Sequence, residues 1–491
     1  MQSGNPLGNS AISKRLIVSA ISMRFSWMST ALRIPRLPFP NSSEGVAQHF
    51  LGILQHGRLS HLRGRCGYLL AVVLVGLLHA DDWPQWRGPH RDGIWRETGV
   101  LDRFPPQGLR ICWRTPVGPG YSGVVVAQGR VYVCDCQLKP ESIERMHCFE
   151  ASTGKLLWSF SYPCSYDGLY YGAGPYATPI VQNGKVYMSG PKGHLHCLDA
   201  GTGKVLWKHD RMAEYPAILP QCGCNSSPII EGNLLIVMGG GRAEGCVIAY
   251  DTDTGQEVWS ALKDRPGGSS PIGINAGGRR QLVVWTLDSV SSLDPATGKV
   301  YWQIPTKAMN DGGALTTPVV YKDLALFICE KALLIKLDPE KTQGALLSQT
   351  ARRKSVNTFV SPVFLDEHYY YSAVNDTLGC FEVVTGNQLW TAKGVSAGNG
   401  NAMFQMTPHE QAVFIFTDGG QLLLAHLAPS GYTELDRATL LEPTKGTWTP
   451  ISGKPKTWAQ PAYANRHIFA RSDEELVCAS LEADVPQKGN E

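Results

Sequence analysis

Cysteines whose spacing could support chemistry lie between the repeats of this 491-residue chain. Cys222 and Cys224 are one residue apart, Asn225 follows them directly, and Cys164 precedes another repeat. Thiols at this spacing can bind zinc, but a structural zinc site normally draws its ligands from two such motifs. We therefore expect structural or unpaired thiols first, a disulfide as the alternative, and a metal site as the least favoured interpretation. Together these four residues mark a candidate loop face.

Four aspartates recur at one position of the repeat and could act as general bases or calcium ligands. They are Asp199, Asp251, Asp294 and Asp338. The first three are followed by Thr-Gly at the third and fourth positions, a pattern typical of hairpin turns. In such turns the Asp side chain caps its own backbone and glycine accepts a positive φ. Because capping accounts for these carboxylates, we expect no catalytic residue and no metal ligand among them.

The turns belong to a repeat of 43 to 52 residues that ends, in its best copies, in tryptophan. Strong copies close at Trp158, Trp207, Trp259, Trp302 and Trp390, and weaker ones at Leu346 and Leu435. A Ser/Thr-Pro step, as at Thr178-Pro179, precedes a short strand-forming segment, and proline suits the first residue of a strand. Such a unit repeated radially is typical of a β-propeller blade. We expect each closing tryptophan to dock on the neighbouring blade.

The number of blades follows from the two ends of the repeat region. Trp113 closes a strand that has no repeat before it, and residues 460–480 supply strands that have no closing tryptophan. Pairing these ends would remove two free sheet edges. The sequence therefore predicts an all-β, eight-bladed β-propeller of four-stranded antiparallel blades over residues 109–481, closed by its N- and C-terminal strands. Seven blades is the alternative.

Residues 1–80 differ in composition from the rest of the chain. They contain eight basic residues and one acid, Glu44, and end in an apolar run over 67–78 followed by Ala80. This pattern predicts a leader with a secretory signal peptide, and the run is short for a membrane span. We then expect an N-terminal strap at 81–108, the propeller at 109–481 and a C-terminal tail at 482–491. The expected location is the periplasm or the exterior.

The overall charge argues against nucleic acid as a partner. The formal net charge is +3, and the excess of basic residues lies entirely in the leader. The remaining residues carry 37 basic and 41 acidic side chains, so they offer no basic surface for phosphates. We expect a chain that does not span the membrane once the leader is removed. The sequence predicts no particular oligomeric state.

The repeated segment Ala-x-Asp-x-x-Thr-Gly-x-x-x-Trp, as at residues 249–259, resembles the tryptophan-docking motif of pyrroloquinoline quinone (PQQ) repeat propellers. The resemblance covers most of residues 109–481. The opening Asp82-Trp83-Pro-Gln-Trp86-Arg-Gly also resembles the start of secreted PQQ-like propellers of planctomycete-type bacteria. The superfamily holds quinoprotein alcohol and glucose dehydrogenases, and a non-enzymatic propeller that helps to assemble outer-membrane β-barrels.

The resemblance implies two candidate functions. A dehydrogenase of this family would need a Ca²⁺ site, an aspartate base and, in the alcohol dehydrogenases, two adjacent cysteines. This sequence has no Cys-Cys dipeptide. We therefore expect no cofactor, and a scaffold without catalysis that binds a protein or an envelope polymer through its loop face. The alternative is a dehydrogenase that uses PQQ and Ca²⁺ to oxidise alcohols or sugars.

Overall fold

The computed structural model describes residues 82–214, 219–239, 245–306, 314–328, 332–350, 359–397, 402–444 and 457–483. The expected leader, residues 1–80, lies outside the described residues, as does the expected tail from residue 484. Within these ranges the only helix is α4 (Arg211–Glu214), and none is long and apolar enough to cross a bilayer.

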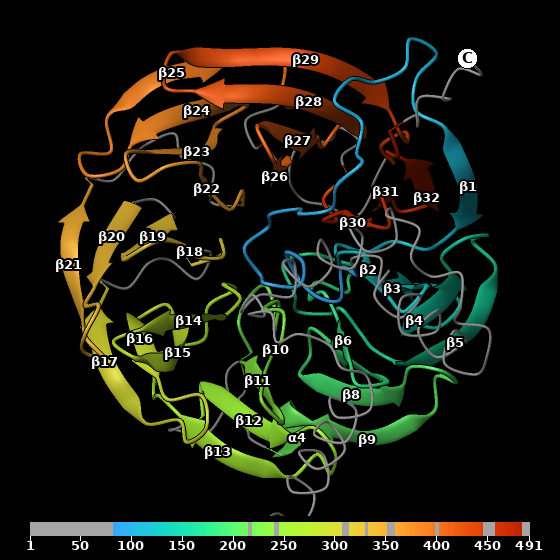
Figure 1. The fold of residues 1–491 in the computed structure, drawn as a ribbon. Helices are drawn as coiled ribbons and strands as arrows, with labels where there is room; N and C mark the ends of the chain where they lie inside the picture. Colours follow the sequence, from blue (N-terminus) through green and yellow to red (C-terminus); the bar gives the residue numbers. More distant parts are fainter. Residues whose placement is uncertain are drawn as a thin grey trace, which may run out of the picture. The chain divides into compact units, whose positions relative to one another are not determined.

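The strands form eight four-stranded sheets, which are arranged as blades in a ring (Figure 1). The first four blades in chain order are β2 (Val125–Ala127), β3 (Arg130–Gln137), β4 (Ile143–Glu150), β5 (Leu156–Pro163); β6 (Ile180–Gln182), β7 (Lys185–Ser189), β8 (His194–Asp199), β9 (Val205–Asp210); β10 (Ile229–Glu231), β11 (Leu234–Met238), β12 (Val247–Asp251), β13 (Glu257–Ala261); and β14 (Ile272–Ala276), β15 (Arg279–Trp285), β16 (Ser289–Leu293), β17 (Val300–Pro305).

The next three blades are β18 (Val319–Tyr321), β19 (Leu324–Ile328), β20 (Ala332–Leu337), β21 (Gly344–Gln349); β22 (Val363–Phe364), β23 (Tyr369–Val374), β24 (Thr377–Glu382), β25 (Gln388–Ala392); and β26 (Gln405–His409), β27 (Ala412–Phe416), β28 (Gln421–Ala428), β29 (Gly431–Thr439). The eighth is β30 (Ala462–Ala464), β31 (His467–Arg471), β32 (Glu475–Ser480) and β1 (Ile111–Pro116). The predicted eight-bladed fold is confirmed, and the seven-blade alternative is excluded.

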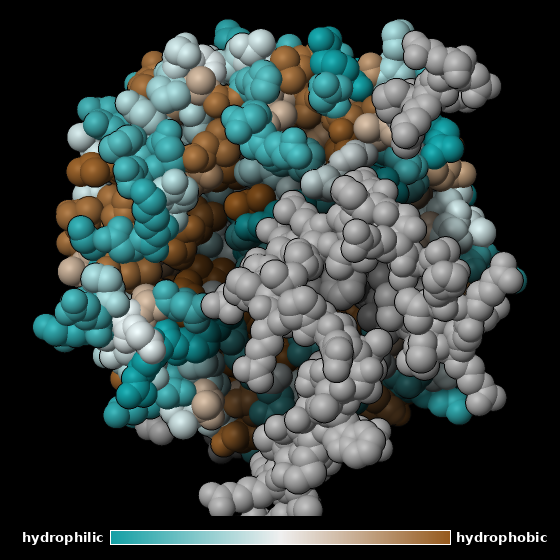
Figure 2. Space-filling model, viewed as in Figure 1, coloured by the Kyte–Doolittle hydropathy of each residue, from teal (hydrophilic) through white to brown (hydrophobic). Residues whose placement is uncertain are grey.

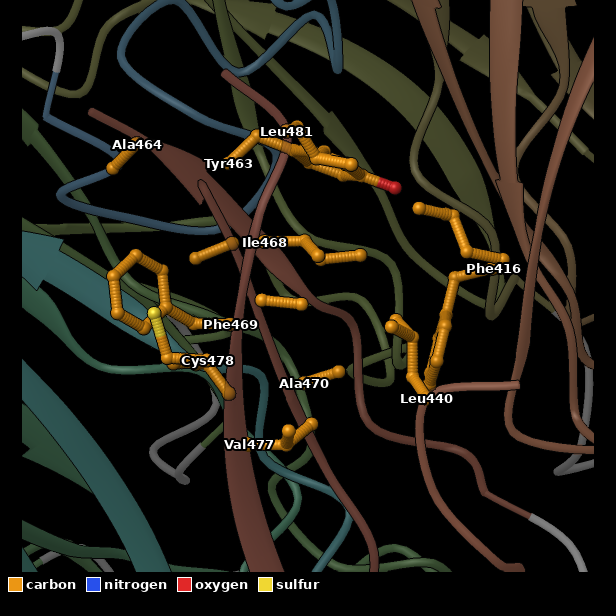
Figure 3. Close-up of a cluster of buried hydrophobic side chains, with 14 of the residues drawn as sticks. Phe416, Leu440, Tyr463, Ala464, Ile468, Phe469, Ala470, Val477, Cys478 and Leu481 are labelled. Carbon is orange, nitrogen blue, oxygen red and sulfur yellow. The ribbon is translucent and has the colours of Figure 1, made fainter. Parts of the chain in front are cut away.

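The eighth blade joins the two ends of the chain. Strand β1 pairs antiparallel with β32, which places Trp113 opposite Cys478. Behind them, β31 and β32 contribute Ile468, Phe469 and Val477 to a buried cluster that also takes in side chains of the seventh blade (Figure 3). Because the first strand completes the last sheet, the ring closes as the sequence predicts.

Each closing tryptophan contacts the next blade. The indole N–H donates to a backbone carbonyl of that blade, as from Trp158 to Ala200 at 3.1 Å and from Trp207 to Thr252 at 3.2 Å. The same donation runs from Trp113 to Ala151, from Trp259 to Pro295 and from Trp390 to Ala428. Trp302 is buried without a hydrogen-bond partner for its Nε1 among the described residues.

The rings lie on turn glycines that leave no room for a side chain. A Cβ built on Gly203 would lie 2.5 Å from the Trp158 ring, and one on Gly255 would lie 2.7 Å from the Trp207 ring. The aspartate ahead of each glycine caps its turn. The Oδ1 of Asp199 accepts from the Thr202 N–H at 2.8 Å, and that of Asp251 accepts from the Thr254 N–H at 2.8 Å. Asp294 and Asp338 accept from Ala296 and Glu340 in the same way.

The outer strand of most blades carries a one-residue bulge next to the closing position. In β5 the extra residue is Leu157, between Leu156 and Trp158, and it is 43% exposed. Apolar side chains at and beside these bulges face solvent along the outer strands. Figure 2 shows apolar patches at the left edge of the molecule, where Figure 1 places β21.

Two closing positions differ from the prediction. The strand register places Ser348 of β21 and Asp436 of β29 where the other copies have tryptophan, so the assignments to Leu346 and Leu435 are wrong. The turns at Asp338 and Asp199 have the same length, since each aspartate N–H donates to the carbonyl five residues further on. In the fifth blade, however, the bulge lies two residue pairs further from the turn, and this shifts the closing position. Gly344 still keeps its place against the Trp302 ring, with a built Cβ 2.9 Å away.

Residues 82–108 pack on the propeller as a strap (Figure 1, blue). Trp83 and Trp95 are each 2% exposed, and their rings pack against Tyr463 at centroid distances of 5.7 and 5.2 Å. The strap backbone is also held, since Trp83 exchanges two hydrogen bonds with Val126 and Trp95 donates to the Pro408 carbonyl. The strap therefore contributes to the core with its aromatic residues.

Candidate functional site

A cavity of about 150 Å³ lies at the centre of the ring. It is lined by segments that lead into the innermost strands of successive blades, together with Trp86 of the strap. These innermost strands surround the axis in Figure 1. Six aromatic residues line the cavity: Trp86, Tyr121, Tyr171, Tyr176, Phe359 and Trp458.

The aromatic residues hold one another in place along one wall. Tyr121 is central, with its ring 5.3 Å from Tyr171, 5.4 Å from Tyr176 and 5.1 Å from Trp458, measured between centroids. Tyr171 meets Trp458 edge-on at 5.8 Å. The Nε1 of Trp458 is buried and lacks a hydrogen-bond partner among the described residues. An aromatic wall with one unused donor suits a ligand that is mainly apolar and carries an acceptor.

Part of the polar lining, Ser227 and Ser270, comes from the Ser/Thr-Pro steps. The N–H of Thr178 donates to Ser227 Oγ at 3.0 Å, and the N–H of Ser227 donates to Ser270 Oγ at 3.0 Å. A hydroxyl of each following blade thus satisfies a buried donor of the blade before it. Thr317 Oγ1 instead accepts from the Trp86 indole at 2.8 Å and so orients the strap ring in the cavity. From the sequence these residues were recognised only because they precede proline. The regular recurrence of a hydroxyl at this position is the signal that could have predicted the hydrogen bonds between blades.

Two strap arginines are buried beside these steps. Arg91 is 5% exposed and donates to three backbone carbonyls: Pro271 at 3.1 Å, Pro228 at 2.8 Å and Ser227 at 3.2 Å. Burial lowers the pKa of Arg91 to about 9, so the side chain stays charged at neutral pH. Arg87 is 2% exposed and donates to the Asp92 carbonyl. Sequence analysis did not single out either residue as a link between blades.

The four candidate loop residues separate in the structure. Cys222 and Asn225 line the cavity. Cys164 and Cys224 are buried away from it, as free thiols at 3% and 4% exposure. Asn225 is packed closely, since a Cβ on Gly268 would lie 2.6 Å from its Oδ1. Two of the four residues therefore belong to the site.

A buried carboxyl supports the loop that carries Tyr171 and Tyr176. Glu144 on β4 is fully buried and accepts hydrogen bonds from the hydroxyls of Tyr162 and, at 2.6 Å, Tyr166. Burial raises the pKa of Glu144 to about 7, although the two hydroxyls favour its ionised form. Tyr166 begins the loop that leads to the cavity wall, so this carboxyl ties the wall to the blade.

Glu144 should make stability fall as the pH rises from about 5 to 7. In that range the folded chain retains a proton that the unfolded chain, with a carboxyl pKa near 4.5, has released. The shift corresponds to about 3 kcal/mol, and Glu144→Gln should remove that dependence. Urea unfolding of both proteins at pH 5, 6, 7 and 8 measures the difference.

The control for that experiment is Asp135, on the neighbouring strand β3. Burial acts to raise its pKa, but hydrogen bonds from His147 and Arg145 outweigh burial and hold the value at about 2. Asp135 therefore stays ionised from pH 5 to 8 and adds no slope of its own over that range, so Glu144→Gln should remove the same part of the slope whether position 135 is Asp or Asn. Equal slopes for wild type and Glu144→Gln would show that Glu144 titrates below this range.

The cavity offers poor ligands to calcium. Its described polar lining consists of amides and hydroxyls, such as Asn225, Gln405 and Ser270, and none of the described lining residues carries a carboxylate. The Arg91 guanidinium also lies against the Ser227 carbonyl. Ca²⁺ prefers carboxylate oxygens and is repelled by a neighbouring cation. These residues do not fit the PQQ–Ca²⁺ pair of a quinoprotein dehydrogenase.

Solved structures with the same fold include both dehydrogenases and BamB. The quinohemoprotein alcohol dehydrogenase of Comamonas testosteroni is 13% identical (82% of this chain, 81% of that chain, TM-score 0.60). A europium-containing methanol dehydrogenase is 11% identical (80% and 90%, TM-score 0.59), and BamB from Moraxella catarrhalis is 13% identical (76% and 99%, TM-score 0.50). At these identities the likeness shows the fold alone.

The sequence has no match among curated proteins. The family model described as outer membrane protein assembly factor BamB matches residues 97–284 and 286–485. These two segments cover the last part of the strap, from residue 97, and all eight blades, and therefore most of the chain. The chain therefore belongs to the family of PQQ-like propellers that includes outer membrane protein assembly factor BamB.

Proposed function

We propose that the chain is a binding scaffold without catalysis, whose axial cavity receives an apolar or aromatic side chain of a protein partner. The observation that carries the proposal is the aromatic wall formed by Tyr121, Tyr171 and Trp458 at the ring axis. Aromatic side chains that converge in a pocket are typical anchors of protein interfaces. An envelope polymer that stacks its sugar rings on the same wall is the competing ligand.

The dehydrogenase alternative has less support from the cavity. The described lining lacks the carboxylates that a Ca²⁺ site would need, and Arg91 places a positive charge nearby. Aromatic rings with hydroxyl and amide groups can bind and orient a ligand without transferring electrons. The proposed scaffold therefore needs no cofactor.

We further propose that the chain acts outside the cytoplasm after removal of its leader. The support is the basic segment, the apolar run over 67–78 and the small residue Ala80, which together are typical of a signal peptide. Membership of the family that includes outer membrane protein assembly factor BamB agrees with an envelope location. Sequencing the amino terminus of the mature protein should give a start close to Asp81, and an intact leader would contradict export by this route.

Removing one aromatic ring from the cavity should weaken partner binding. Tyr171→Ala should cost about 2 kcal/mol, or roughly 30-fold in Kd, if the ring contacts an anchoring side chain. The neighbouring Tyr170 is 43% exposed and does not line the cavity, so Tyr170→Ala is the matched control. Full chain carrying a tag would capture the partner from envelope extract, and Kd would then be measured with the purified partner.

The same preparations separate the alternatives. A partner that binds wild type and Tyr170→Ala equally, but Tyr171→Ala more weakly, supports the scaffold. Retention of isolated envelope polysaccharide with the same dependence on Tyr171 would identify a polymer ligand instead. Stoichiometric uptake of added PQQ with Ca²⁺, together with dye reduction by alcohols or sugars, would overturn the scaffold proposal.

A further inference from the structure

Three soft-donor side chains meet where the ring closes. Cys112 on β1, His467 on β31 and Cys478 on β32 each place a sulfur or ring nitrogen within 4.8 Å of the others. Cys112 is exposed, His467 is partly buried and Cys478 is 1% exposed. Figure 3 shows Cys478 beside Phe469, the residue opposite it in the sheet. The group lies on the eighth blade and shares no residue with the lining of the axial cavity.

The outer-strand bulge explains why Cys112 reaches the other two residues. Trp113 pairs with Cys478 and Ile111 pairs with Ala479, so Cys112 is the extra residue between them. In the other described blades with a closing tryptophan, the bulge residue is Leu157, Leu206, Val258, Tyr301 or Leu389. Among these blades, only the seam between the first and last strands has a thiol at the bulge next to a thiol on the paired strand.

The hydrogen bond of His467 prepares it as a ligand. Its Nδ1 lies 2.5 Å from the backbone oxygen of Asn465. A carbonyl can only accept, so Nδ1 carries the proton and Nε2 of the neutral ring keeps its lone pair. Histidines that bind metals are commonly held in this way by a second hydrogen bond, which fixes the tautomer and the ring. The bond comes from the tight turn at Asn465 and Arg466, which both have positive φ.

We propose that Cys112, His467 and Cys478 form a binding site for a soft divalent cation, Zn²⁺ above all, that ties the first strand of the propeller to the last two. Two thiolates and one imidazole are ligands that Zn²⁺ prefers in tetrahedral sites. Because Cys112 is exposed, a water molecule can take the fourth position. Binding releases one proton from each thiol to solvent and involves no oxidation.

The test uses the full chain, stripped of metal and kept reduced. Zn²⁺ affinity is measured by competition with a chromogenic chelator, and Co²⁺ serves as a spectroscopic probe through its thiolate charge-transfer absorption. Wild type should bind one equivalent of either ion. Cys112→Ser, at an exposed position, and His467→Ala should each weaken binding by on the order of 100-fold. At saturating Co²⁺ the charge-transfer band should fall in Cys112→Ser, which loses a thiolate, and persist in His467→Ala, which keeps both.

The matched control is Cys380→Ser, since Cys380 holds the position of Cys478 in a blade whose bulge residue is Leu389. This variant should bind Zn²⁺ as wild type does. Zn²⁺ should also raise the unfolding midpoint of wild type and of Cys380→Ser but not of Cys112→Ser. Failure of the reduced wild type to bind, or equal binding by Cys112→Ser, would overturn the proposal. So would a Cys112–Cys478 disulfide in protein purified with zinc and without reductant.

Discussion

Replacing Trp158 with alanine is expected to destabilise the propeller by about 3–5 kcal/mol, the usual loss when a large aromatic side chain leaves a packed site. The indole fills the junction between the first two complete blades, lies against Gly203 and donates to the Ala200 carbonyl at 3.1 Å. Alanine leaves a cavity, while the Ala200 carbonyl keeps its hydrogen bonds from Arg130 and Tyr132. Urea unfolding followed by circular dichroism measures the loss, and a midpoint unchanged from wild type would contradict the docking role.

A glycine pair isolates the contact from the backbone effect. Gly203 and Gly184 have nearly the same backbone, with φ of 72° and 73°. A Cβ at Gly203 would lie 2.5 Å from the Trp158 ring, whereas one at Gly184 would meet nothing within 4 Å. Gly184→Ala should therefore cost only the backbone strain of about 1–2 kcal/mol, and Gly203→Ala should cost more.

The double variant completes this experiment. With Trp158→Ala in place, the added Cβ at position 203 meets a cavity, so Gly203→Ala should cost little more than Gly184→Ala does. The two changes would then be clearly non-additive, as expected for residues in contact. Additive losses would mean that the ring and the glycine act independently.

The sequence predicts the fold well because the features that define a blade are local. The Asp199–Gly203 turn and the spacing to Trp207 lie within one hairpin, so one copy predicts its own geometry. The fifth blade fails for the same reason. Its bulge lies two residue pairs further from the turn at Asp338, so a count from the aspartate gives Leu346 where the strand register gives Ser348.

The sites are harder to predict because they join residues from distant repeats. The cavity brings Trp86 of the strap together with Tyr121, Tyr171 and Trp458, which come from loops before three different blades. Aromatic residues in loops carry no repeated spacing, and of the cavity lining only Cys222 and Asn225 were predicted as residues of a loop face. Cys112 and Cys478 lie near opposite ends of the chain and meet only through the pairing of β1 with β32.

Loss of the Arg91 side chain is expected to release the strap. Arg91 joins the third and fourth blades, because its guanidinium reaches the Ser227 and Pro228 carbonyls of one and the Pro271 carbonyl of the other. Arg91→Ala would leave these buried acceptors without a donor, at a cost of about 3–5 kcal/mol. Arg91→Lys should recover only part, since one ammonium cannot match the planar fork of donors.

Arg91→Ala should affect the strap and the cavity as well as the overall stability. Trp86 lies close to Arg91 in the strap and forms part of the cavity lining, so a released strap should open residues 82–108 to protease and weaken partner binding. The matched control is Arg96→Ala, because Arg96 is on the same strap but pairs at the surface with Asp92, a contact worth about 0–1 kcal/mol. Protease resistance of Arg91→Ala equal to that of Arg96→Ala would show that the aromatic contacts of Trp83 and Trp95 hold the strap without the arginine.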